Sequence, residues 1–207
     1  MYFSGKAVCI GVNPCFDVTL RLKELDDDKV NRVQSESRQA AGVAVNIARR
    51  LRSLRIQATV CGIAGQDNLR AFTDELVSEG IRSDFIKIPG AIRENLTILC
   101  GGKTYKINRS GPLCTSEALA ELRGYLNTVV SQEDVVIFGG APASGMTVAE
   151  YASLMRLAGS LGMRVVVDTD VLKADHLFAI KPFIAAPNIH ELEYIMGRKL
   201  PKYEDRL

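Results

Sequence analysis

Short apolar runs alternate with segments of helical period along most of this chain. The apolar runs are rich in Val and Ile, lack polar alternation and are bounded by Gly, Asn, Asp or Pro, as is typical of strands covered by helices on both faces. The predicted strands are residues 6–12, 58–63, 134–138, 164–167 and 183–186. This alternation predicts an α/β fold built on a doubly wound, mostly parallel sheet flanked by helices.

The helices between these strands are marked by apolar stripes and by end signals. Stripes with a period of 3.6 residues run through residues 44–54, 69–76 and 119–129. Gly80 stands where a helix ends in a left-handed residue. Thr147 and Glu150 have the spacing of a capping box, which predicts a helix that starts there. A last helix is predicted over residues 190–196.

Two stretches depart from the alternation and predict a lid. About thirty residues precede the helix near Gly42, which is long for a βα loop, and residues 18–22 within them alternate like a half-buried strand. A second alternating run is followed by Gly101 and Gly102, a hairpin signal. We expect inserts near residues 17–38 and 92–109 to form a small antiparallel β lid on one domain, residues 1–207. The lid would cover a ligand, form a dimer contact, or do both.

Composition and charge narrow the partners. The 207 residues carry 26 Lys and Arg against 24 Asp and Glu, without a basic run, so the sequence offers no electrostatic case for nucleic acid. No apolar stretch approaches the roughly 20 residues of a membrane span, so no membrane partner is expected. Five widely spaced cysteines without a C-x-x-C pair fit neither a disulfide framework nor a zinc site. We expect a cytoplasmic protein with no direct metal ligands.

Small and polar residues follow the predicted strands at the edge where open α/β sheets bind ligands. They are Asn13, Asp17, Gly65, Asp67, Gly139, Gly140, Asp168, Asp170 and Asn188. Loop ends are polar in any case, so the set is more informative than its members. Near Gly42, small residues lead into a helix, where backbone amides can approach an anionic or hydroxylated ligand, and Asn46 interrupts the apolar stripe. The alternative is a helix start packed tightly on the sheet.

Other motifs are excluded on their spacing. Gly102 and Lys103 do not form a phosphate-binding P-loop. A P-loop needs another glycine five positions before Gly102, and that position is occupied by Thr97. No dinucleotide-binding G-x-G-x-x-G follows a strand. His176 and His190 are too few and too far apart for a metal site, and no nucleophile–His arrangement is recognisable.

Seven motifs stand in a characteristic order along the chain: GVNPCFDVT at 11–19, the glycine-to-Asn segment 41–48, GQDN at 65–68, RENLT at 93–97, NRSGP at 108–112, DT at 168–169 and PNIHEL at 187–192. Together they resemble the motifs of the PfkB sugar kinases, which have a ribokinase-like fold. The order is the family's, the likeness covers the whole chain, and it is greatest for the branch of 1-phosphofructokinases and tagatose-6-phosphate kinases.

The resemblance implies a sugar-phosphate site. Asp17, Gly42 and Asn46 would bind sugar hydroxyls. Arg93, from the lid insert, would pair with the phosphate already on the sugar, a task that suits a planar guanidinium. The implied reaction is phosphorylation by ATP of a hexose phosphate, either fructose 1-phosphate to fructose 1,6-bisphosphate or tagatose 6-phosphate. An unphosphorylated ribose or nucleoside substrate would not need Arg93.

The resemblance also implies cofactors and a partner. Asn188 and Glu191 match the N-x-x-E motif that organises water-bound Mg²⁺ near the phosphates of ATP, where a carboxylate suits a hard cation. The β lid of such kinases often mediates dimerisation, so a homodimer through the lid is one expected assembly. The family's Gly-Ala-Gly-Asp, which supplies the catalytic base, is expected beyond Leu207, so no catalytic residue is assigned within the chain.

Three further departures from the family pattern support an alternative. Val43 and Ala44 replace a lysine and a second glycine, the pair Gly139 and Gly140 lacks two serines, and Ala186 replaces a lysine. One hypothesis is therefore an N-terminal portion of a hexose-phosphate kinase. The other is a truncated, non-catalytic homologue that acts as a sugar-phosphate-binding or scaffold protein.

Overall fold

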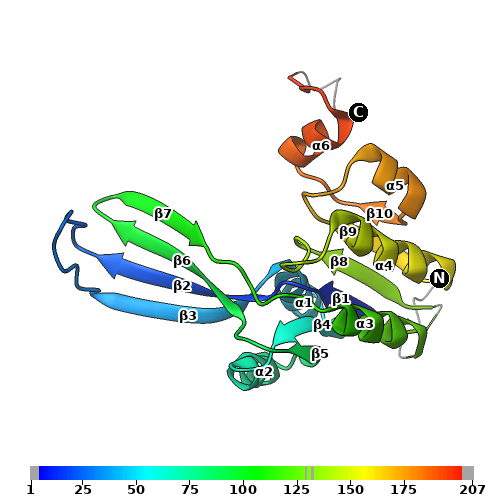
Figure 1. The fold of residues 1–207 in the computed structure, drawn as a ribbon, viewed down its shortest axis with the longest axis horizontal. Helices are drawn as coiled ribbons and strands as arrows, with labels where there is room; N and C mark the ends of the chain where they lie inside the picture. Colours follow the sequence, from blue (N-terminus) through cyan, green and yellow to red (C-terminus); the bar gives the residue numbers. More distant parts are fainter. Residues whose placement is uncertain (1–4, 129, 132, 202–207) are drawn as a thin grey trace.

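The computed structural model describes residues 5–128, 130–131 and 133–201, which form two sheets and the helices packed on them (Figure 1). The larger sheet has the strand order β10-β9-β8-β1-β4-β5, and all its pairs are parallel. Its strands are β1 (Ala7–Gly11), β4 (Ala58–Gly65), β5 (Arg82–Ile88), β8 (Val135–Gly139), β9 (Arg164–Asp168) and β10 (Ile184–Ala185). The predicted doubly wound parallel sheet is confirmed.

Helices cover both faces of this sheet, because its strands carry apolar side chains on both faces. The helices are α1 (Val43–Ser53), α2 (Leu69–Ser78), α3 (Ser116–Thr128), α4 (Val148–Ser160), α5 (Ala174–Ile180) and α6 (Ile189–Met196). In the fully buried β1, Cys9 faces a core shared with α1 and α2, whereas Val8 and Ile10 face a core shared with α3 and α4. Among the described residues, no helix combines the length and the apolar character needed to cross a membrane.

The smaller sheet is the lid, and it projects from one side of the larger sheet (Figure 1). It has the order β3-β2-β6-β7, with strands β2 (Cys15–Leu22), β3 (Ser35–Ala41), β6 (Arg93–Cys100) and β7 (Lys103–Asn108). The hairpin predicted at Gly101 and Gly102 forms, with positive φ at both glycines. The lid is mixed rather than wholly antiparallel, because β2 and β6 pair in parallel from Cys15 beside Arg93 onward.

The pattern of apolar residues missed three elements. β3 reads SESRQAA, and its first five residues are exposed. The sequence of this edge strand therefore shows no alternation of apolar and polar residues that could predict it. β5 reads RSDFIKI, in which polar residues interrupt the apolar run. α5 has only seven residues, too few for a clear helical stripe. The predicted capping box of Thr147 and Glu150 and the helix end at Gly80 are both present.

β10 forms one edge of the larger sheet. It pairs with β9 alone and has two residues, and the neighbouring Phe183 is exposed together with Ile184.

All five cysteines of the chain are free thiols, and four of them are buried.

The close approach of β1 and β4 at the centre of the larger sheet requires a glycine at position 62. This residue has a φ of 143°, pairs with Gly11 in the β1–β4 register, and brings its α-carbon close to the backbone of β1. A Cβ placed there would lie 2.0 Å from the carbonyl oxygen of Gly11. Backbone atoms cannot give way as the end of a flexible side chain can, so only glycine fits.

Gly62→Ala should therefore lower the free energy of unfolding by roughly 2–6 kcal/mol, the sum of backbone strain and overpacking. The control is Gly124→Ala in the middle of α3, where a Cβ would meet nothing within 4 Å. That change should raise the free energy of unfolding by up to about 1 kcal/mol. Urea denaturation followed by circular dichroism measures both, and equal stability of the two variants would contradict the packing described here.

Candidate functional site

A cavity of about 240 Å³ lies where β1 and β8 end and the lid begins. Its lining includes Asp17 and Arg93 from the lid strands β2 and β6, and Gly42 and Asn46 from the start of α1. The structure therefore brings together the four residues that the sequence assigned to sugar binding, although they span more than seventy positions of the chain. Their roles in binding stay predictions.

The first turn of α1 supplies one wall of the cavity. Gly42 precedes the helix with a φ of 117°, a conformation that favours glycine, and no side chain caps the helix. The first turn carries no acidic residue, and the residues from Val43 to Asn46 line the cavity. Uncapped N–H groups and the positive end of the helix dipole make this wall suitable for an anionic or hydroxylated ligand.

The same turn packs tightly on the strand ends. A Cβ on Gly11 would lie 3.0 Å from the Cβ of Ala44, and one on Gly139 would lie 3.0 Å from the backbone nitrogen of Ala44. The two interpretations of this segment, a ligand-facing turn and a tightly packed helix start, are thus compatible.

Two of the departures from the family pattern face each other across this contact. A Cβ on Gly139 would lie 3.0 Å from Cγ1 of Val43, and one on Gly140 would lie 3.4 Å from its Cγ2. The chain therefore carries the larger side chain on α1, and glycines at the last position of β8 and directly after it. The absence of serine hydroxyls and the presence of Val43 are parts of one packing arrangement.

Arg93 enters the cavity with its charge uncompensated. Its Nη1 donates to Oδ1 of Asn95 at 2.9 Å and to the carbonyl oxygen of Arg109 at 3.2 Å, and its Nη2 donates to the carbonyl oxygen of Asn13 at 3.5 Å. Its buried Nε has no hydrogen-bond partner within the described part of the chain. All these acceptors are neutral, so a buried donor and a full positive charge remain for an anion.

The acidic residue beside Arg93 does not neutralise it. Glu94 pairs with Arg38 at 3.1 Å and with Arg109 at 3.7 Å on the lid. Neighbouring strand residues point to opposite faces of a sheet, so Glu94 and Arg93 face different surroundings.

Asn95 connects Arg93 with Asp17 and was not predicted as a site residue. Its Nδ2 donates to Oδ1 of Asp17 at 3.2 Å and contacts Sγ of Cys15 at 3.2 Å. Burial raises the pKa of Cys15 to about 12, with a further contribution from Asp17, so this residue is a neutral thiol. The signal that could have found Asn95 is its position two residues after Arg93, on the same face of β6.

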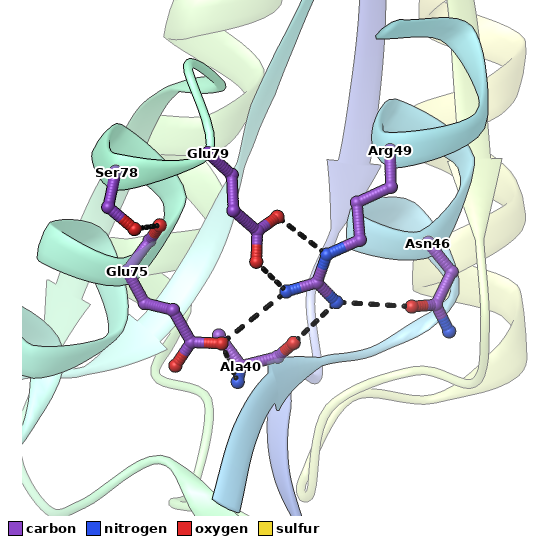
Figure 2. A network of polar contacts seen from close by, with 6 residues as sticks. All are labelled: Ala40, Asn46, Arg49, Glu75, Ser78 and Glu79. Carbon is purple, nitrogen blue, oxygen red and sulfur yellow. Dashed lines mark hydrogen bonds and ion pairs between the residues drawn. The ribbon is translucent and has the colours of Figure 1, made fainter. Parts of the chain in front are cut away.

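A polar network fixes the junction between lid and helix (Figure 2). The Arg49 guanidinium donates to both carboxylate oxygens of Glu79 at 2.7 Å and to the carbonyl oxygen of Ala40 at 2.7 Å. Glu75 accepts from the backbone nitrogen of Ala40 at 2.8 Å, and Arg49 also reaches Oδ1 of Asn46 at 3.5 Å. Side chains from α1 and from the C-terminal end of α2 thus hold the end of β3, where the lid leads into α1.

The network predicts a specific pH dependence of stability. Hydrogen bonding to Arg49 lowers the pKa of Glu79 below its ordinary value of 4.5. A lowered folded-state pKa stabilises the folded protein fully above the unfolded value, and this contribution is lost as the pH falls through the folded-state pKa. From about pH 7 to about pH 3, the free energy of unfolding should fall more steeply in the wild type than in Glu79→Gln.

The two stability profiles, measured by denaturant titration, should converge at the acid end. Asp74→Asn is the control, because it removes an exposed ion pair of 3.7 Å with Arg70 on the same helix and should change stability little. Parallel profiles for the wild type and Glu79→Gln would show that the Arg49 contact contributes nothing to stability.

Asn188 and Glu191 do not line the cavity. They form the capping box of α6: Oδ1 of Asn188 accepts from the backbone nitrogens of His190 and Glu191, and Glu191 accepts from the backbone nitrogen of Asn188 at 2.8 Å. Burial, and next the Glu191 charge, raise the pKa of Asp168 at the end of β9. The negative charge of Glu191 thus acts on Asp168 at the edge of the sheet where the parallel strands end. Within residues 5–201, gaps excepted, no three His, Cys, Asp or Glu side chains form a group that could hold a metal ion.

With this geometry in place, comparison identifies the family. The pattern of the pfkB family carbohydrate kinases matches residues 5–207, so the chain belongs to that family. It is 30% identical to a 1-phosphofructokinase of Vibrio cholerae over 204 residues, which are 97% of this chain and 63% of that protein. It is 26% identical to a tagatose-6-phosphate kinase of Staphylococcus epidermidis over 191 residues, which are 91% of this chain and 62% of the relative. The chain thus spans less than two thirds of the length of these relatives.

Solved structures share the fold. Phosphofructokinase-2 from Escherichia coli in complex with fructose-6-phosphate superposes with a TM-score of 0.87 at 19% sequence identity, over 98% of this chain and 67% of that one. A 1-phosphofructokinase-like structure from Thermotoga maritima gives a TM-score of 0.74 at 21% identity, over 97% and 66%.

Proposed function

We propose that this chain forms the sugar-phosphate site of an ATP-dependent kinase that phosphorylates a ketohexose phosphate, with fructose 1-phosphate as the substrate. The observation that carries the proposal is Arg93, a guanidinium with an unpartnered, buried Nε and neutral acceptors, facing the same cavity as Asp17. A positive group and a carboxylate that line one small cavity match a ligand that carries both a phosphate and hydroxyls.

The roles follow from the chemistry of each group. Arg93 pairs with the phosphate of the sugar. Asp17 accepts hydrogen bonds from sugar hydroxyls, and Asn46 binds a further hydroxyl beside the open N–H groups after Gly42. Asn95 holds the Arg93 and Asp17 side chains in place, since it bonds to both. This fixed spacing distinguishes a sugar phosphate from a free sugar or from free phosphate.

The substrate assignment rests on the relatives as well as on the site. The relative with 30% identity is named a 1-phosphofructokinase, and the one with 26% identity is named a tagatose-6-phosphate kinase. Both names describe ketohexose phosphates, so tagatose 6-phosphate is the matched comparison ligand in any binding experiment.

ATP and Mg²⁺ are the proposed cofactors. Asp168 and Glu191 are two carboxylates close enough that the charge of one raises the pKa of the other. A divalent cation would relieve that repulsion, so the residues fit a Mg²⁺ ion held largely through its water ligands. When bound, Mg²⁺ would neutralise charge on the ATP phosphates. Asn188 would keep Glu191 oriented from the start of α6.

The lid is the proposed dimer contact. Its outer strands β3 and β7 each pair on one side only, and β7 exposes Tyr105 and Ile107. Free strand edges with exposed apolar side chains favour pairing with another chain. The phosphofructokinase-2 of Escherichia coli has been solved in a tetrameric inhibited form. The proposed compartment is the cytoplasm, where five free thiols stay reduced.

A second candidate is a non-catalytic sugar-phosphate-binding protein. Two features favour it: the absence of hydroxyls at Gly139 and Gly140, which line the sugar cavity, and the loss of a positive charge at Ala186, where the family pattern has a lysine on the nucleotide side. An ATP-consumption assay with fructose 1-phosphate and the purified chain separates the two: turnover excludes the non-catalytic protein, whereas binding without turnover supports it.

Arg93→Ala should weaken binding of fructose 1-phosphate by roughly 2–5 kcal/mol, because it removes the charged partner of the phosphate. The control is Arg109→Ala, which removes an exposed guanidinium from the same region and should change the affinity little. Isothermal titration calorimetry measures both, with fructose as a ligand that lacks the phosphate. Undiminished binding in Arg93→Ala would remove this residue from the site.

A further inference from the structure

A second cavity of about 400 Å³ lies at the edge of the sheet opposite to the candidate sugar site. It opens where β1, β4 and β5 begin and where α1 ends, whereas the sugar site lies where β1 and β8 end. Four basic residues line it: Lys6, Arg52, Arg55 and Arg82. We call it the basic cavity.

The charges of the basic cavity are not balanced within its walls. No acidic residue is part of its lining in the described portion of the chain. None of the four basic side chains makes an ion pair or a side-chain hydrogen bond with a described residue. Two carboxylates lie nearby without lining the cavity. Asp134 accepts a hydrogen bond from the backbone nitrogen of Lys6 at 2.7 Å, and Glu79, whose pKa Arg52 helps to lower, is already bound by Arg49 through both carboxylate oxygens. The chain as a whole has a net charge of only +2, so four cations in one cavity are a local concentration.

Stabilisation of a helix end does not account for this arrangement. Basic residues near the last turn of a helix interact favourably with its dipole, which explains Arg52 at the end of α1 and Arg55 just beyond it. Lys6 directly precedes β1 and Arg82 begins β5, so neither belongs to a helix end. Two strands and one helix therefore each bring a cation to one concave surface, at the cost of mutual repulsion.

The lining also indicates the chemistry of the ligand. Guanidinium groups bind phosphate oxygens in a bidentate manner, and the side chains of Gln57 and Thr59 add neutral donors. The described lining contains no aromatic residue on which a nucleobase could stack. We propose that the basic cavity binds a compact anion that carries two phosphate groups, such as a pyrophosphate or a sugar bisphosphate, at a site separate from the substrate cavity.

Calorimetric titration of the full chain with inorganic pyrophosphate tests the proposal, at constant ionic strength and without Mg²⁺. The wild type should bind pyrophosphate saturably, and Arg52→Gln combined with Arg82→Gln should weaken binding by about tenfold or more, which corresponds to about 1.4 kcal/mol. Since both residues are exposed, circular dichroism should show an unchanged fold.

The matched control removes the same charge elsewhere. Arg50→Gln combined with Arg70→Gln takes one exposed cation from the last turns of α1 and one from α2, and neither residue lines the basic cavity. This variant should bind pyrophosphate within about twofold of the wild type, because only screened, distant charge is lost. Equal weakening in the two double variants would overturn the proposal, since it would mean diffuse attraction rather than a site. The absence of saturable binding by the wild type would also overturn it.

A third variant separates the two cavities. The guanidinium of Arg93 in the sugar site is the alternative binding group for pyrophosphate. If the basic cavity is the site, Arg93→Ala should leave pyrophosphate binding unchanged while it weakens the binding of fructose 1-phosphate. Loss of pyrophosphate binding in Arg93→Ala alone would assign the anion to the sugar site and refute a separate one. The result is independent of the proposed function, because it does not require catalysis or sugar binding.

Discussion

The close seating of the first turn of α1 on the ends of β1 and β8 is the contact on which the site depends. It requires glycine at Gly11 and Gly139, where a Cβ would come within 3.0 Å of Ala44, and it requires the positive φ of Gly42. Because the helix starts this close to the strand ends, its uncapped N–H groups face the cavity instead of a loop. The same residues thus allow both the close packing of α1 and the access of its N–H groups to a ligand. Val43 and Gly139, which both depart from the family pattern, pack against each other and preserve this contact.

The register of the lid supplies the second half of the site. Parallel pairing of β2 with β6 sets Cys15 beside Arg93 and Asp17 beside Asn95, at the end of the lid that meets the larger sheet. The anion-binding group and the carboxylate therefore reach the cavity from adjacent strands at a fixed spacing. The network around Arg49 then holds the end of β3, through the backbone of Ala40, against α1 and α2 (Figure 2). The lid is consequently tied to the helix that carries Asn46.

Sequence patterns predicted the parallel sheet because buried strands and amphipathic helices leave strong periodic signals. They predicted Asp17, Gly42, Asn46 and Arg93 through a family resemblance, and the structure places all four on one cavity. They could not reveal the parallel β2–β6 pairing, because alternation along a strand does not specify the direction of its partner. The exposed strand β3 left no apolar pattern, and Asn95 and Arg49 act through contacts between distant segments. The basic cavity was not predicted for the same reason, because its cations come from segments that are far apart in the sequence.

The proposed function requires a phosphorylated ketohexose to lie in the cavity against Arg93 and Asp17. A crystal structure of the chain with fructose 1-phosphate would show this arrangement or its absence. Phosphate oxygens should lie about 2.7–2.9 Å from the Arg93 guanidinium nitrogens, with sugar hydroxyls on Asp17 and Asn46. A sugar phosphate bound elsewhere on the chain, or in this cavity with its phosphate away from Arg93, would contradict the proposed function.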